Sequence, residues 1–106
     1  IGDGDYKKRL YESFLSARLQ KNVTFYGSLS HNEIFCKLSS MHALLLPSEN
    51  EGLPHCVIEA MSMGVVPIAT RINGSTDVII KDGQDGYLVD FEDVDGFAYR
   101  VYRLYK

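Results

Sequence analysis

The chain has 106 residues, of which 45% are hydrophobic and 24% charged, and 14 acidic against 11 basic residues give a formal net charge of −3. This composition is typical of a globular domain, and the length allows no more than one ordinary domain. The sequence has no apolar run near the roughly 18 residues that a membrane span requires, and no block of Lys and Arg that would neutralise a phosphate backbone. We therefore exclude a membrane-spanning chain and expect no nucleic-acid partner.

The cysteines and histidines indicate the compartment and argue against a metal site. Cys36 and Cys56 form no CxxC pair, and no signal peptide opens the chain, so neither a disulfide framework nor a zinc site is predicted. His31, His42 and His55 lack the spacing of metal ligands. We expect a cytoplasmic protein without a bound metal.

Helical and strand patterns alternate along the chain. In chain order they predict a helix over residues 5–20, a strand over 23–26, a helix over 31–40, a strand over 42–46, a helix from Pro54 that ends before Gly64, a strand over 65–69, a short helix through Ile80, a strand over 87–89 and a final helix.

Capping residues support several of these helix ends. Asp5 can accept hydrogen bonds from the first amides of its helix. Ser30 and Glu33 have the spacing of a capping box. Pro54 suits the first position of a helix. Ser75 and Thr76 are expected to cap the short helix that follows them.

The two ends of the chain suggest that it is part of a longer protein. Ile1 is followed by a turn sequence and no initiator Met is present, while residues 96–106 form an apolar helical pattern without a Gly, Asn or Pro stop signal. We expect residues 1–106 to form a single partial domain.

The strands are nearly continuous in apolar residues and alternate with helices. This arrangement predicts an α/β fold, with a Rossmann-like parallel sheet covered by helices on both faces in three layers. In such sheets ligands bind beyond the carboxyl ends of the strands, which directs attention to the loops after Ile1, Leu46 and Ala69. The loop after Leu46 contains Gly52, where the backbone can approach a ligand, and the amides of residues 52–56 open a helix that favours hydroxyl or phosphate oxygens.

An ordered series of motifs spans nearly the whole chain. In chain order the motifs are Gly2-Asp3-Gly4, Val23-Thr24-Phe25-Tyr26-Gly27, Leu46-Pro47-Ser48, Glu51 and Glu59 separated by seven residues, Glu59-Ala60-Met61, Gly64, Pro67, Ala69-Thr70, Gly74, Asp82-Gly83 and Gly86-Tyr87-Leu88-Val89. The series resembles the nucleotide-sugar-binding half of glycosyltransferase family 4 (group 1), whose members are retaining transferases with the two-domain GT-B fold. The resemblance implies half of a GT-B fold.

The resemblance also implies roles for residues of the first loop. Glu51 is expected to contact hydroxyls of the transferred sugar near the reaction centre, as the catalytic residue. The backbone around residues 52–55 is expected to bind the sugar or diphosphate of the donor, through Gly52, Leu53, Pro54 and His55. Glu59 is expected to bind the ribose hydroxyls, because an ionised carboxylate makes strong hydrogen bonds to vicinal hydroxyls.

Two glycines in other loops complete the donor-binding residues that the resemblance implies. Gly4 is expected to line the base pocket, although a structural turn is the alternative interpretation. Gly74 belongs to a loop in which Asn73 and Asp77 stand where the family has Gly and Glu. Because Asn tolerates a positive φ, we expect this turn to persist.

Pattern alone gives plainer interpretations of the same side chains. Glu59 lies opposite the centre of an apolar helical arc formed by its neighbours, which is typical of a solvated residue. Glu51 would be an ordinary polar loop residue. Arg71 could meet phosphate at the ligand edge, and a solvated Arg is the alternative.

The resemblance implies metal-independent, retaining transfer of a hexose from a nucleotide diphosphate sugar to a hydroxyl acceptor, in glycan or polysaccharide biosynthesis. It implies no cofactor, since the nucleotide sugar is itself the substrate. The acceptor, such as a sugar or lipid-linked glycan, would bind through an acceptor domain that this chain lacks, and the parent protein could associate peripherally with a membrane. The family's diphosphate-clamping Arg and Lys would lie upstream of Ile1, so the isolated chain is expected to be inactive.

Two other functions stay open at this point. A nucleotide-sugar epimerase with the GT-B fold should lack the Glu51–Glu59 pair. A non-catalytic α/β interaction module of the receiver type would need a phosphorylatable Asp at a central strand end, where Leu46-Pro47-Ser48 provides none.

Overall fold

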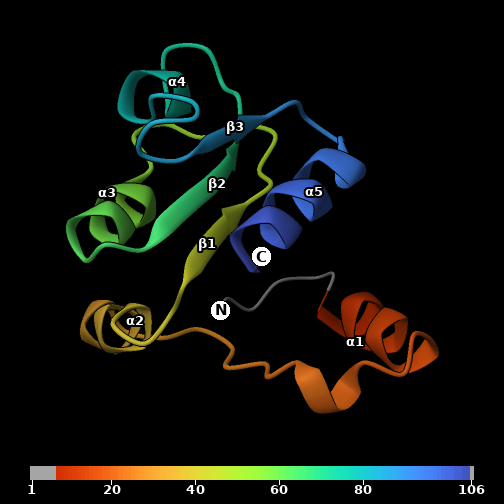
Figure 1. The fold of residues 1–106 in the computed structure, drawn as a ribbon. Helices are drawn as coiled ribbons and strands as arrows, with labels where there is room; N and C mark the ends of the chain where they lie inside the picture. Colours follow the sequence, from red (N-terminus) through yellow and green to blue (C-terminus); the bar gives the residue numbers. More distant parts are fainter. Residues whose placement is uncertain (1–6, 106) are drawn as a thin grey trace. The chain divides into compact units, whose positions relative to one another are not determined.

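The computed structural model describes residues 7–105 (Figure 1). The elements are α1 (Lys7–Ser16), the 3₁₀ helix η1 (Gln20–Asn22), α2 (His31–Leu38), β1 (Ala43–Leu46), α3 (His55–Ser62), β2 (Val66–Thr70), α4 (Thr76–Ile79), β3 (Tyr87–Val89) and α5 (Val94–Tyr105). The chain divides into two compact units, an N-terminal unit of residues 1–36 and a C-terminal unit of residues 37–106.

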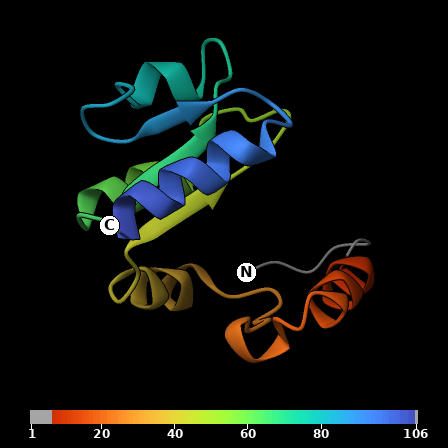
Figure 2. The ribbon, with the colours of Figure 1, turned by 45° about the vertical axis from the view of Figure 1, so that its right-hand side comes forward.

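The C-terminal unit contains a parallel sheet with the strand order β1-β2-β3. Ala43 of β1 pairs with Val66, and Ile68 of β2 pairs with Tyr87. Parallel neighbours require a crossover connection, and α3 and α4 lie in the two crossovers. Figures 1 and 2 show α3 and α5 on opposite faces of the sheet. The predicted α/β fold with three layers is therefore confirmed in this unit.

The core of the C-terminal unit lies between the sheet and α3. Its buried members are Val57, Ala69, Ile80 and Leu88. Ile68, whose side chain alternates with that of Ala69 along β2, is also completely buried. A strand that is buried on both faces reads as a continuous apolar run, which explains why this strand could be predicted from the sequence.

In the N-terminal unit, the predicted helix over residues 5–20 is shorter than expected. It ends at Ser16, because Arg18 adopts a positive φ of 58°. The Leu19 amide donates to the Phe14 carbonyl at 2.8 Å and the Arg18 amide to the Leu15 carbonyl at 3.0 Å. These two bonds form a Schellman motif, in which Gly is the usual residue at the left-handed position. Asp5, the expected N-cap, lies outside the described residues.

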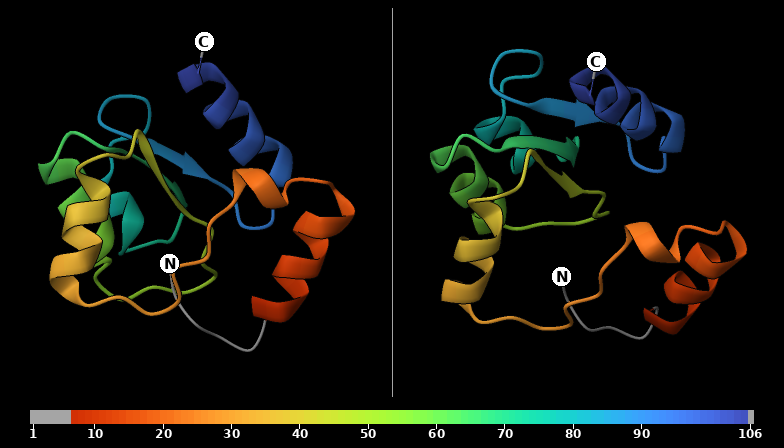
Figure 3. Two further views of the ribbon diagram at one scale, coloured as in Figure 1. Left: turned by 90° about the horizontal axis from the view of Figure 1, so that it is seen from below. Right: turned by 60° about the horizontal axis from the view of Figure 1, so that its bottom comes forward.

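The predicted strand over residues 23–26 is wrong. Val23 is extended, with φ −126° and ψ 132°, and the segment follows an extended path between η1 and α2 (Figure 3). However, none of the described strands pairs with it. An extended segment becomes a strand only when a neighbour accepts and donates its backbone hydrogen bonds. Phe25 instead packs edge-on against Tyr11 and Phe14, with ring centroids 5.7 and 5.9 Å apart.

Two other helix starts test the capping predictions. The Glu33 amide donates to Ser30 Oγ at 3.2 Å, and the Ser30 amide donates to Glu33 Oε1 at 3.4 Å, which confirms the capping box of α2. Pro54 is the N-cap of α3 and not its first helical residue, because its ψ of 86° is not helical.

Within residues 7–105, no helix has the length and apolar character needed to cross a membrane.

Candidate functional site

The candidate site lies at the carboxyl edge of the sheet, where the loops after β1 and β2 meet. These strands are parallel neighbours, so both loops leave the same edge. The Ser75 hydroxyl donates to the Gly52 carbonyl at 2.5 Å. This hydrogen bond joins the loop of residues 47–54, which we call the donor loop after the role that the resemblance implies, to the loop of residues 71–75.

Glu51 is held within the donor loop. Its side chain is half-buried, and the Ser48 hydroxyl donates to Glu51 Oε1 at 2.8 Å. A hydrogen bond to an ionised carboxylate is stronger than one between neutral groups, so it fixes the direction of this acid. Ser48 is a residue to which the sequence analysis gave no role, and its S-x-x-E spacing from Glu51 is the signal that could have found it.

The donor loop leads directly into the first turn of α3. The Pro54 carbonyl accepts from the Val57 amide at 3.0 Å and from the Ile58 amide at 3.3 Å. Amides earlier in the turn have no carbonyl ahead of them within the helix, and the helix dipole favours negative charge there. Pro54 is buried, whereas His55 is exposed and Leu53 is 60% exposed. The start of α3 can therefore be reached by a ligand with anionic or hydroxyl oxygens.

Glu51 and Glu59 both raise the pKa of the Cys56 thiol. Burial raises the pKa of the Cys56 thiol, and the Glu51 carboxylate and, more weakly, the Glu59 carboxylate raise it further, while the amides of Cys56 and Val57 oppose the shift. Both carboxylates therefore lie within electrostatic range of Cys56. Glu59 is half-buried, so it is not the fully solvated residue that the helical pattern favours.

The loop after β2 is closed by its own polar groups. Gly74 has a φ of 76°, and its amide donates to Asp77 Oδ1 at 2.8 Å. Asn73 does not adopt a positive φ; the turn persists because Gly74 alone takes the left-handed conformation. Asp77, which replaces the family's Glu, thus stabilises the turn.

Ser75 and Thr76 act differently from the simple caps that were expected. Ser75 occupies the N-cap position of α4, but its side chain makes no capping hydrogen bond there, because its hydroxyl is directed to the donor loop. Thr76 is completely buried. Its hydroxyl donates to the Thr70 carbonyl at 2.5 Å and accepts from the Ile72 amide at 2.8 Å. Thr76 therefore fixes the loop to the end of β2.

Arg71 is engaged by carboxylates of its own unit. Its Nη2 lies 3.3 Å from Asp82 Oδ2, and its Nε lies 3.8 Å from Asp90 Oδ1. Asp82 also accepts from the Leu88 amide through its other oxygen, at 3.0 Å. These contacts connect the loop after β2 with the segments that precede and follow β3, and the contact of Arg71 with phosphate stays a prediction.

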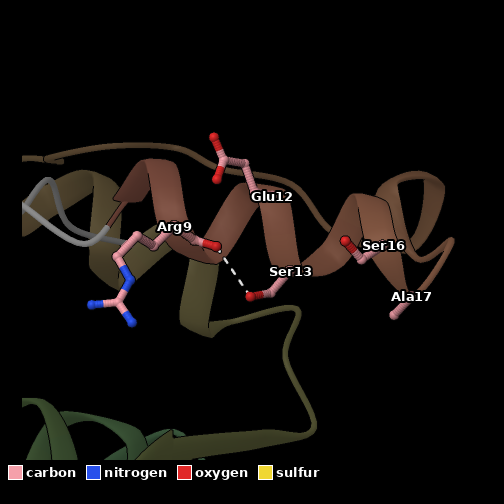
Figure 4. A pocket seen from close by; sticks show the side chains of 5 residues that line it. All are labelled: Arg9, Glu12, Ser13, Ser16 and Ala17. Carbon is pink, nitrogen blue, oxygen red and sulfur yellow. Dashed lines mark hydrogen bonds between the residues drawn. The ribbon is translucent and has the colours of Figure 1, made fainter.

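A separate hollow lies on α1 in the N-terminal unit. It has a volume of about 590 Å³ and is lined by Arg9, Glu12, Ser13, Ser16 and Ala17. Figure 4 shows that these side chains come from α1 and from Ala17 just after it, and that Arg9 and Glu12 point in different directions. The Ser13 hydroxyl donates to the Arg9 carbonyl at 3.1 Å, a bond within the helix. The hollow contains none of the predicted site residues.

The structure thus brings together most of the predicted site. Glu51, Gly52 and Gly74 belong to two loops joined by one hydrogen bond, and Glu59 lies on the helix that the donor loop begins. Gly4 lies outside the described residues. Among residues 7–105, no three His, Cys, Asp or Glu side chains gather as metal ligands would.

Comparison with known proteins gives a consistent match along the sequence. The family model described as glycosyl transferases group 1 matches residues 1–106. The 2-deoxystreptamine N-acetyl-D-glucosaminyltransferase of Niallia circulans is 34% identical over 103 residues, which cover 97% of this chain and 26% of that protein. The UDP-Gal:alpha-D-GlcNAc-diphosphoundecaprenol alpha-1,3-galactosyltransferase of Escherichia coli is 31% identical over 105 residues, which cover 98% of this chain and 26% of that protein.

A solved structure agrees in fold. The C-terminal domain of a group 1 glycosyl transferase from Francisella tularensis superposes with a TM-score of 0.85 and 30% identity, over 95% of this chain and 52% of that one. The chain spans about a quarter of the length of the two curated relatives, since it covers 26% of each.

Proposed function

Because this chain belongs to the group 1 glycosyl transferases, we propose that it forms the nucleotide-sugar-binding part of a retaining glycosyltransferase. The enzyme transfers a hexose from a nucleotide diphosphate sugar to a hydroxyl acceptor. The observation that carries the proposal is the joined pair of loops, in which Ser75 binds Gly52 beside the first turn of α3. The name of the Escherichia coli relative gives UDP-Gal as that enzyme's donor.

The chemistry of transfer explains what these residues would do. The bond between the anomeric carbon and the diphosphate breaks, a bond from the acceptor oxygen to the same carbon forms, and the acceptor's proton passes to an oxygen of the leaving diphosphate. Negative charge develops on the leaving diphosphate, where the amides at the start of α3 can stabilise it. Glu51, held by Ser48, would orient the hydroxyls of the transferred sugar. Glu59 would bind the ribose.

The two glutamates can be separated by kinetics in the full-length protein. Glu51→Gln should lower kcat by about a hundredfold or more, because its contact acts at the reacting sugar. Glu59→Gln should raise the donor KM by about tenfold, the effect expected from losing a charge-assisted hydrogen bond. Glu49→Gln is the matched control, since Glu49 is an exposed residue of the same loop.

The assay presents labelled UDP and GDP sugars and follows transfer to a hydroxyl acceptor. If Glu51→Gln chiefly raised the donor KM and Glu59→Gln chiefly lowered kcat, the roles of the two residues would be the reverse of those proposed. Conversion of the donor into an epimeric nucleotide sugar, without transfer, would identify an epimerase instead. Transfer should persist in EDTA, as expected of a metal-independent enzyme; loss of the rate with EDTA and its return with Mn²⁺ would contradict that part of the proposal.

The 106-residue chain alone is expected to bind such donors only in the millimolar range. A few net hydrogen bonds of about 0.5 to 1.5 kcal/mol each give no more than that affinity, and the net charge of −3 opposes an anionic ligand. Calorimetric titration measures it, and micromolar affinity would show that the chain holds a complete donor site.

We further propose a cytoplasmic enzyme, and fractionation of cells would show whether it associates peripherally with a membrane.

A further inference from the structure

We propose that Ser75 is a positioning residue for donor binding, because its hydroxyl sets the orientation of the peptide group between Gly52 and Leu53. The inference rests on the proposed function, since it assigns donor binding to the loop that contains this peptide. Ser75 itself need not touch the donor. It would act through the backbone of the donor loop.

The hydrogen bond joins two loops that are distant in sequence. Ser75 is 5% exposed, and its Oγ lies 2.5 Å from the Gly52 carbonyl oxygen, 23 residues earlier in the chain. Glycine has the greatest backbone freedom of any residue. A Cβ at Gly52 would have no atom within 4 Å, so side-chain packing does not hold the loop at this point. The hydrogen bond from Ser75 therefore restrains the donor loop at Gly52, where side-chain packing does not.

The geometry of the peptide bond gives this restraint a direction. The described chain contains no cis peptide bond, and in a planar trans peptide the C=O and the following N–H point in opposite directions. Because the Gly52 carbonyl turns toward Ser75, the Leu53 amide turns away from the loop after β2. Leu53 is 60% exposed, so this amide lies at a residue that a ligand can reach. Fixing the Gly52 carbonyl thus also fixes the direction in which the Leu53 N–H points.

The Ser75 hydroxyl belongs to a segment that is hydrogen-bonded to the end of β2. The Ser75 amide donates to the Ile72 carbonyl at 3.1 Å. The neighbouring Thr76 is completely buried and bonds both the Thr70 carbonyl and the Ile72 amide. Thr70 is the last residue of β2, the central strand. Ser75 therefore holds the donor loop in a fixed position relative to the end of β2.

The test compares Ser75→Ala, Ser75→Thr and Ser40→Ala in the full-length protein. Ser40→Ala is the matched control, because the exposed Ser40 hydroxyl also donates to a backbone carbonyl, that of Lys37 at 3.0 Å, but within its own turn. Ser75→Ala should raise the donor KM about fivefold to tenfold, the effect of losing one hydrogen bond, with kcat changed less than KM. Ser75→Thr keeps the hydroxyl and should restore the KM. Ser40→Ala should leave both constants unchanged.

Thermal unfolding of each variant separates positioning from packing. Equal KM values for the wild type and Ser75→Ala, in a protein that transfers sugar, would overturn the inference and leave the proposed function standing. A raised KM in Ser75→Thr as well would also overturn it, because it would show that shape at residue 75 matters and the hydroxyl does not. A wild-type protein that transfers sugar from none of the donors would contradict the proposed function itself, and the inference with it.

Discussion

The N-terminal and C-terminal units differ in what holds them together. Every buried hydrophobic side chain that the structure describes lies between Leu38 and Val89, in the C-terminal unit. Among residues 8–36 the best-covered side chains are only half-buried. Helices nevertheless occur in both units, whereas all the strands that the structure describes lie in the C-terminal unit. The comparison teaches that local signals are enough for a helix, while a strand also needs a partner and a core to cover it.

The largest expected difference concerns the same substitution in each unit. Ile68→Ala should lower the free energy of unfolding by about 3 kcal/mol, because Ile68 is completely buried and a cavity would remain. Ile34→Ala on α2 should cost about 1 kcal/mol, because Ile34 is only half-buried. Urea unfolding of the 106-residue chain measures both. Equal losses would show that the N-terminal unit has a core of its own.

The next comparison removes a hydroxyl from each unit. Thr76→Val should cost about 2 kcal/mol, since it leaves the Ile72 amide and the Thr70 carbonyl without the partner they have in a buried site. Ser30→Ala should cost about 1 kcal/mol, because water can replace the exposed cap of α2. The same unfolding experiment decides this, and a larger loss for Ser30→Ala than for Thr76→Val would reverse the interpretation.

A third comparison exchanges the residues that end two helices. Both α1 and α3 end in a Schellman motif, with Arg18 at a φ of 58° in the first and Gly64 at 75° in the second. Gly64→Ala should cost about 1 kcal/mol through backbone strain alone, because a Cβ there meets no atom within 4 Å. Arg18→Gly should stabilise the chain by about 0.5 kcal/mol, since it relieves that strain. Helix content and unfolding midpoints measure the two opposite signs; a destabilised Arg18→Gly would contradict this account.

The smallest effect is a pH dependence that arises from Cys56 in the C-terminal unit. Folding raises the pKa of the Cys56 thiol above its ordinary value of 9.0, first by burial and then by the nearby carboxylates. The folded state therefore keeps the thiol protonated where the unfolded chain releases the proton. Stability from this group should be complete below pH 9.0 and decline as the pH rises through the folded pKa. The free energies of unfolding of the wild type and Cys56→Ala should approach each other as the pH rises through that range. A difference that stays constant with pH would exclude the effect.

Most of the C-terminal unit could be predicted from the sequence. The apolar runs at β1, β2 and β3 and the helix signals between them were sufficient for a parallel α/β fold, because each strand is covered by neighbours that the pattern also predicts. The capping box at Ser30, in the N-terminal unit, and the end of α3 before Gly64 were also predicted correctly, because each depends on residues within one turn of the helix.

The sequence by itself indicated Glu51, Gly52 and Gly74 as loop residues of the candidate site, and Glu59 as a residue of the helix that follows the first loop. The tertiary structure alone decided how those loops are held, because the partners are far apart in the chain. Ser75 reaches Gly52 across 23 residues, a contact that no local spacing encodes. The extended segment of residues 23–26 has a strand's sequence, but none of the described strands pairs with it. Backbone hydrogen bonds between distant segments depend on where the whole chain places them, and a pattern along one segment contains no information on its partner.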